Sequence, residues 1–399
     1  GITWTFNQDL NTAVEAGHYL YGQFVTGDYW VVGPVTITGI SPVSVTVDSG
    51  GAWTKHGSML NPVADPYQGY DSRVTGAPQY WSATKNVALG VDAGHPLVIS
   101  NGSTLVSTES QTTPDNWPQL LNGAVLTVLA TAPASGSFRP ALAGNDKSIQ
   151  FNETDLSRGV EGADGYSYLK NLTDVSGGTT YSTIEGWFAR PWTETQRGWW
   201  AGRTFPENNM KDYGREISFQ TARAALALNI NRTDAAKRTL LIHYVQLGID
   251  YYGLLTGSAE GRTIWQADGG IQHGRKLPIL VAAIALDDTA MKAMFAKTGD
   301  YLYDGADSDG YPNPTGPYNW YPYYMNPTDW YHFQEDDQVY YVKKFHVDAT
   351  TGGVPWSGFP AFAPDSRMTL ATPYSTADIG LPEWSYRPAY RTNTSINGP

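Results

Sequence analysis

The hydrophobic pattern of this 399-residue chain changes its period once, and that change limits the folds open to it. In about the first 150 residues, short β-branched runs are separated by Gly, Pro and Ser-Pro, a pattern typical of strands and turns. From about residue 210, apolar residues recur every three to four positions, which indicates amphipathic helices. The chain therefore predicts an α+β multidomain protein in which a β region precedes a helical region.

Six segments of the first part carry a strand pattern: residues 29–32, 35–38, 43–47, 97–100, 104–107 and 124–129. The dipeptide Asn101-Gly102 lies between the fourth and fifth of these segments. An Asn-Gly between two apolar runs predicts a tight hairpin that pairs the flanking strands. Many short strands with frequent turns favour a β-sandwich-like domain over residues 1–150.

Three helices are expected in the second part, over about 213–229, 234–255 and 274–287. Thr233 is placed to cap the second helix, and Pro278 falls in the first turn of the third. After Lys276 the third helix is apolar nearly all round, which predicts that other elements enclose it. Consecutive helices of this kind favour an α/α-toroid-like domain over 151–399, with aromatic-rich loops and fewer recognisable hairpins than a complete toroid needs.

Charge and composition exclude several classes of function. The formal net charge is −12, whereas a nucleic-acid binder needs a basic stripe. The absence of cysteine excludes disulfides, thiolate metal sites and cysteine nucleophiles. No run of about 18 apolar residues is present to span a membrane. There is no phosphate-binding loop, dinucleotide fingerprint or zinc-ligand spacing, so neither a cofactor nor a metal is expected.

Four short motifs carry a resemblance to known proteins: Trp-Gln-Ala-Asp-Gly-Gly-Ile-Gln-His-Gly-Arg-Lys-Leu-Pro-Ile-Leu at 265–280, Tyr-Trp-Val-Val-Gly at 29–33, Phe-Arg-Pro at 138–140 and Gly-Leu-Pro-Glu-Trp at 380–384. With them the chain resembles a broad group of secreted bacterial proteins. That group is similar in helical organisation to the α/α-toroid polysaccharide lyases of alginate-lyase and heparinase type. The resemblance implies a polysaccharide substrate and a secreted, extracellular or periplasmic location, and the start at Gly1 without Met is expected of a processed or trimmed chain.

The segment 268–276 is the first candidate site. Its two glycines allow close backbone approach, and His273 and Arg275 fall at the start of an apolar helix, where an anion is favoured. Elimination from a uronic acid needs a base, an acid and a group that neutralises the carboxylate. His273 is expected to transfer protons and Arg275 to hold the carboxylate. The alternative is that Arg275 and Lys276 cap the helix or pair with Asp268.

The second candidate segment is 208–216. Asn208 and Asn209 can hold a sugar carboxylate and Tyr213 can supply a phenol. The alternative is that the Asn residues are ordinary helix caps and that Tyr213 simply packs. The catalytic set of the lyase hypothesis is therefore His273, Tyr213, Arg275, Asn208 and Asn209.

The chain holds 14 Trp, 26 Tyr and 12 Phe, more large rings than a core alone explains. Flat rings can stack on the C–H patches of sugars, and those in loops suit a glycan cleft, although about half are expected to pack internally. The predicted substrate-binding residues are Gln272, His332, Trp200, Trp265, Trp320 and Trp330. His243 lies inside a helix and is expected to be a hydrogen-bonded core histidine.

Two other functions stay open. A glycoside hydrolase would use two carboxylates from Asp268, Glu185, Glu335 and Asp336, although 335–337 also fits a solvated acidic turn. A non-catalytic glycan-binding or surface-assembly protein would use the rings alone. A polysaccharide lyase that cleaves a uronate-containing glycan by β-elimination is the leading hypothesis.

Overall fold

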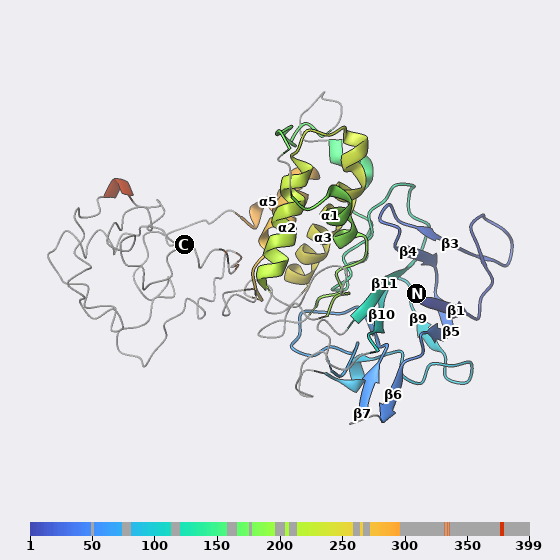
Figure 1. Ribbon diagram of the computed structural model, residues 1–399. Coiled ribbons are helices and arrows are strands. Elements are labelled where there is room, and N and C mark those ends of the chain that lie inside the picture. The colour runs from blue at the N-terminus through green and yellow to red at the C-terminus, as the bar shows by residue number, and fades with distance from the viewer. Residues whose placement is uncertain are drawn as a thin grey trace, which may run out of the picture.

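The computed structural model describes residues 1–48, 52–73, 81–112, 120–157, 166–174, 178–195, 204–206, 214–257, 264–265, 272–295, 331, 333, 335 and 376–378. Within these residues the protein is α+β, with a β-sheet region followed by a region of five helices (Figure 1). The α+β prediction is confirmed at this level. The described helices do not form an evident toroid.

The described strands form three sheets. The three-stranded sheet has the order β1 (Thr3–Phe6), β5 (Val35–Ser41), β9 (Leu97–Ile99). The six-stranded sheet has the order β2 (Leu10–Asn11), β3 (Tyr19–Gln23), β4 (Tyr29–Val32), β11 (Leu120–Leu129), β10 (Ser103–Ser110), β8 (Ser58–Leu60). The two-stranded sheet pairs β6 (Val45–Asp48) with β7 (Ala52–Lys55).

The six-stranded sheet lies between the three-stranded sheet and the helices. Successive side chains of a strand point to opposite faces, so neighbours on β10 and β11 enter different cores. Leu105 and Leu126 share a buried cluster with Ile37 of the three-stranded sheet. Val106 and Val125 belong instead to the larger cluster that contains the helices. Strands β10 and β11 at the centre of the sheet are therefore buried on both faces.

The hairpin predicted at Asn101-Gly102 is wrong. Strand β9 pairs with β5, whereas β10 pairs with β11 and β8, so the two strands that flank the dipeptide lie in different sheets. Gly102 has a φ of 76° and its N–H donates to the carbonyl of Val128 at 2.8 Å. The turn exists as the dipeptide predicts, but it passes the chain from one sheet to the other, where each strand buries its apolar face.

The five helices are α1 (Tyr181–Phe188), α2 (Gly214–Leu228), α3 (Asp234–Thr256), α4 (Lys276–Ala285) and α5 (Thr289–Ala293). The three predicted helices are confirmed as α2, α3 and α4, with ends within about two residues of those expected. The hydroxyl of Thr233 accepts the N–H of Ala236 at 3.3 Å, which confirms this residue as the cap of α3. No described helix combines the length and apolar character that crossing a membrane requires.

Helix α4 packs closely against α3 but is not enclosed on every side. Pro278, Ile279 and Ala282 are buried, whereas Ile284 is 42% exposed, so the prediction of full enclosure is wrong. The close contact depends on Gly248 of α3, because a Cβ at that position would lie 2.4 Å from the carbonyl oxygen of Pro278. The missing side chain lets the two helix backbones approach each other.

Replacing Gly248 by alanine should therefore destabilise the protein, with a loss of about 1–3 kcal/mol in the free energy of unfolding, as in other overpacked cores. Gly186 of α1 is the matched control, because a Cβ there meets nothing within 4 Å. Gly186→Ala should add about 0.5–1 kcal/mol through its higher helix propensity. Urea denaturation followed by circular dichroism measures both, and equal effects of the two substitutions would contradict the packing argument.

Candidate functional site

The turn formed by residues 272–275, directly before α4, is the centre of the candidate site. Gly274 has a φ of 91°, a left-handed conformation that favours glycine. A Cβ on Gly274 would also lie 2.6 Å from the backbone nitrogen of Ser218 on α2. The turn thus requires glycine for its backbone conformation and for its contact with α2.

Arg275 fastens this turn through a buried ion pair. Its Nε lies 3.2 Å from Oε2 of Glu194 and its Nη2 lies 2.6 Å from Oε1, and neither side chain is exposed. Its Nη1 donates to the carbonyl oxygen of His273 at 2.8 Å. Burial lowers the pKa of Arg275, but Glu194 raises that pKa further, so the guanidinium stays charged. The pair connects the segment 193–195 to the backbone of the turn.

These contacts change the role expected for Arg275. A guanidinium with no exposed surface and its edge occupied by Glu194 is not placed to hold a substrate carboxylate in this structure. Gln272 is 1% exposed and Trp265 is 0% exposed, so neither presents a surface to a sugar. Of the predicted lyase and sugar-binding residues that the structure describes, which are Gln272, His273, Arg275 and Trp265, His273 alone is partly exposed. The structure supports Arg275 as a residue that positions His273.

Most of the other predicted site residues lie outside the described residues. They are Asn208, Asn209, Tyr213, Trp200, Trp320, Trp330, His332, Asp268 and Asp336. Their roles stay predictions. Glu185 is described, on α1, where its charge adds to burial in raising the pKa of Tyr181.

Glu335 contacts the turn directly. Its Oε1 accepts the N–H of Gly274 at 2.7 Å, while its Oε2 is buried and has no hydrogen-bond partner among the described residues. Burial raises the pKa of this carboxyl group and outweighs the opposing effects of backbone N–H donors, among them that of Gly274, and of the charges on Arg275 and Lys276. An imidazole and a carboxyl group with a raised pKa therefore flank the same glycine.

Phe333 packs against two other aromatic rings, Trp265 and Phe295. This ring is 1% exposed and stacks on Trp265, with centroids 6.2 Å apart, and on Phe295 at the same separation. Tyr251 and Trp265 form an edge-to-face pair with ring centroids 4.9 Å apart. Trp265 therefore packs against Tyr251 and Phe333 with no exposed surface in this structure, and its predicted sugar-stacking role stays a prediction.

The raised pKa of Glu335 leads to a pH dependence of stability. The folded state favours the protonated carboxyl, so the contribution of Glu335 is greatest at low pH and falls as the pH rises above the ordinary value of 4.5. Glu335→Gln cannot ionise. The unfolding free energy of the wild type should therefore fall relative to that of Glu335→Gln as the pH rises from about 4.5 to 7. Denaturation curves of both proteins at several pH values check this, and a constant difference would contradict it.

Two residues of the site carry no signal in the sequence. Glu194 lies 81 positions from its partner Arg275, in an aromatic segment without helix or strand periodicity. The hydroxyl of Tyr251 on α3 lies 3.5 Å from Oε2 of Glu194. Only the packing of α3 beside the turn brings these groups together.

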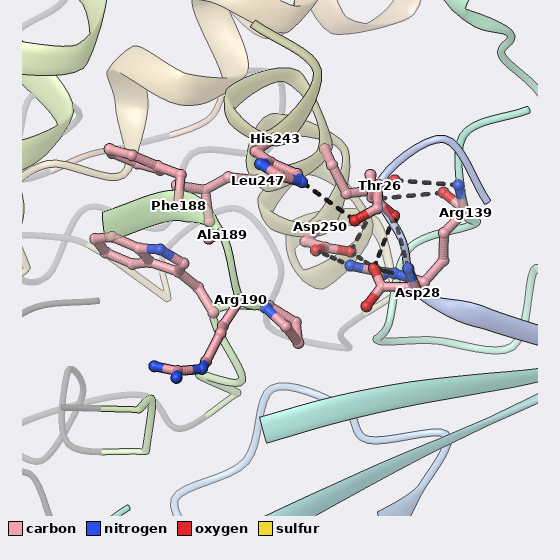
Figure 2. A pocket seen from close by; sticks show the side chains of 12 residues that line it. Thr26, Asp28, Arg139, Phe188, Ala189, Arg190, His243, Leu247 and Asp250 are labelled. Carbon is pink, nitrogen blue, oxygen red and sulfur yellow. Dashed lines mark hydrogen bonds and ion pairs between the residues drawn. The ribbon is translucent and has the colours of Figure 1, made fainter. Parts of the chain in front are cut away.

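A second polar cluster surrounds a hollow between α3 and the segment that follows α1 (Figure 2). Arg139 is fully buried there and binds two carboxylates, Asp28 through Nε at 2.7 Å and Asp250 through Nη1 and Nη2 at 2.6 Å each. Nε2 of His243 lies 3.1 Å from the carbonyl oxygen of Thr26, which confirms His243 as a hydrogen-bonded histidine. The cluster joins the β3–β4 turn to α3.

Comparison with known proteins does not assign the chain to a family. It matches no protein-family model, no curated protein and no solved structure. The resemblance to toroid lyases therefore stays a prediction, and a functional assignment depends on the geometry of the turn. Within the described part of the chain, no group of three or more His, Asp or Glu side chains is arranged to hold a metal ion.

Proposed function

We propose that the protein is a polysaccharide lyase that cleaves a uronate-containing glycan by β-elimination. The observation that carries this proposal is a partly exposed imidazole, His273, on a turn fixed by the buried Arg275–Glu194 pair. Proton abstraction needs a base held in a defined position, and this anchoring supplies it. The neighbouring carboxyl of Glu335 adds a second group that can exchange a proton.

In the proposed reaction, His273 removes the proton on the carbon next to the substrate carboxylate. The electrons of that C–H bond form a carbon–carbon double bond, and the bond to the leaving glycosidic oxygen breaks. A proton donor completes the step by protonating that oxygen. Tyr213 is the group predicted from the sequence for this donor, with Asn208 and Asn209 as the predicted holders of the carboxylate.

The proposal includes the finer architecture and location expected from the sequence. A β-sandwich-like domain is supported by the cluster that the three-stranded and six-stranded sheets bury between them. A toroid-like helical domain is supported by α2, α3 and α4, which pack against one another in succession. A secreted or periplasmic location follows from the resemblance alone.

The experiment that tests the function measures ultraviolet absorbance during incubation with uronate polymers such as alginate, pectate, hyaluronan and heparin. β-Elimination creates an unsaturated product that absorbs, and hydrolysis does not. His273→Ala should lower kcat about 10²- to 10⁴-fold, the usual contribution of a general base. His95→Ala is the matched control, because the His95 side chain is 83% exposed and pairs only with neighbouring Asp92 in the described chain.

The absence of absorbance on every polymer, or full activity in His273→Ala, would contradict the proposal. A second function has one specific observation in its favour: the raised pKa of Glu335 is the property that a glycosidase requires of its general acid. New reducing ends without absorbance, abolished in Glu335→Gln, would assign a hydrolase. Binding of a polymer without any product would assign a glycan-binding protein.

A further inference from the structure

His56 lies in the connection between β7 and β8 and forms two reciprocal hydrogen bonds with Ser110, the last residue of β10. The backbone N–H of His56 donates to Oγ of Ser110 at 2.9 Å, and the backbone N–H of Ser110 donates to Nδ1 of His56 at 3.0 Å. The paired residues of β8 and β10 end with Ser58 and Ser107. The two hydrogen bonds therefore hold the end of β10 to the β7–β8 connection beyond the last paired residues.

The hydrogen bond from Ser110 determines the state of the His56 ring. A backbone N–H can only donate, so Nδ1 of His56 must present its lone pair to Ser110. The ring is then neutral, with its hydrogen on Nε2. Protonation adds a hydrogen to Nδ1 and turns this acceptor into a donor that faces another donor. Because His56 is partly exposed, its ring can exchange protons with solvent, and the imidazolium cannot keep this hydrogen bond.

The surroundings of the ring also favour its neutral form. Burial is the largest cause that lowers the pKa of His56, and the charge of Lys55 on β7 adds to it. Arg73 acts in the same direction, whereas Glu109 on β10 and Asp71 raise the pKa without reversing the shift. Asp71 is already paired, because its Oδ2 lies 3.0 Å from Nη2 of Arg73.

We propose that His56 and Ser110 form an acid-sensitive latch, which holds the end of β10 to the β7–β8 connection when His56 is neutral and releases it when His56 is protonated. Histidine is the side chain whose charge ordinarily changes between about pH 5 and 8. Since the folded state favours the neutral ring, the stability that the latch contributes is complete above the ordinary pKa of 6.5 and is lost as the pH falls below it. The latch lies in the β-sheet region and does not depend on the proposed function.

Amide hydrogen exchange followed by NMR tests the latch on the full-length protein. The protection factor of the Ser110 amide compares its exchange rate with that of an unfolded chain at the same pH, so the intrinsic pH dependence of exchange cancels. In the wild type this factor should fall about five- to tenfold between about pH 7.5 and about pH 4.5, the value of one hydrogen bond. The amide of Val106, which is paired with Met59 of β8, is the control and should keep its protection.

His56→Asn is the variant that should keep the latch closed in acid. The side-chain oxygen of Asn can take the place of Nδ1 and accepts a hydrogen bond at every pH in this range. Asn also tolerates the left-handed φ of 56° at this position. Protection of Ser110 in His56→Asn should therefore not change with pH. His95→Asn is the matched control, because the His95 side chain is 83% exposed, and it should respond to acid as the wild type does.

Two outcomes overturn the latch: constant protection of Ser110 in the wild type, or the same acid response in His56→Asn. If His56→Asn does not fold, the scalar coupling across the hydrogen bond between the Ser110 nitrogen and Nδ1 of His56 decides on the wild type. We expect this coupling at about pH 7.5 and its loss at about pH 4.5. Its persistence in acid would show that the hydrogen bond does not respond to protonation.

Discussion

Replacing Glu194 by alanine is expected to lower the free energy of unfolding by about 3–5 kcal/mol, the cost of breaking a buried ion pair by removing one partner. The substitution leaves the guanidinium of Arg275 charged and without surface exposure. It also removes the acceptor nearest the hydroxyl of Tyr251. Urea denaturation followed by circular dichroism gives the unfolding free energies.

The control for Glu194→Ala is Asp174→Ala. Asp174 is 56% exposed and pairs with Arg232 at 3.7 Å, so its removal should cost no more than about 1 kcal/mol. A similar small loss for Glu194→Ala would show that the buried pair contributes little to the fold. The large difference is expected because solvent replaces the lost partner only at the exposed site.

A double variant separates the stability role of this pair from its role in positioning His273. Glu194→Met together with Arg275→Met removes both charges, and such replacements are often neutral or stabilising. Most of the lost stability should therefore return. The proposed lyase activity should remain below that of the wild type, because the hydrogen bond from Arg275 to the His273 carbonyl is also absent. Full activity in the folded double variant would show that the pair does not position His273.

The sequence predicts the helices well because their signal is local. The apolar spacing of α2, α3 and α4, and the cap at Thr233, depend on residues a few positions apart. Strand pairing depends on distant residues. The segments around Asn101-Gly102 form strands as expected, yet each pairs with a partner chosen by the two buried cores. The dipeptide specifies a turn and not the sheet on either side of it.

The same dependence on distant residues explains why the sequence predicts Arg275 as the holder of a substrate carboxylate. An arginine beside two glycines at a helix start has the local chemistry of an anion site. Its actual anion is Glu194, which lies 81 residues away in the chain and arrives only through folding. Trp265 shows a related limit, since a ring in a Gly-rich segment is expected at the surface and is here 0% exposed between Tyr251 and Phe333.

Asp250→Ala is expected to have the second large effect, again about 3–5 kcal/mol in the free energy of unfolding. Asp250 on α3 receives two hydrogen bonds from Arg139 at 2.6 Å each and the N–H of Leu142 at 3.0 Å. The substitution would leave a fully buried guanidinium with Asp28 as its one carboxylate and would orphan a buried backbone donor. Denaturant titration of the variant against the wild type measures the loss.

Asp250→Asn identifies which part of this loss is electrostatic. Asp146→Ala is the control at an exposed acid. Asn keeps an oxygen that can accept the N–H of Leu142 but has no charge to pair with Arg139. Asp250→Asn should therefore lose less unfolding free energy than Asp250→Ala. Asp146 is an exposed acid that accepts hydrogen bonds from nearby Ser148 and Gln150, and its replacement should cost no more than about 1 kcal/mol. Equal losses in Asp250→Asn and Asp250→Ala would assign the effect to charge. If Asp250→Ala loses as little stability as Asp146→Ala, the contacts of Asp250 on α3 with Arg139 and Leu142 do not contribute substantially to the stability of the fold.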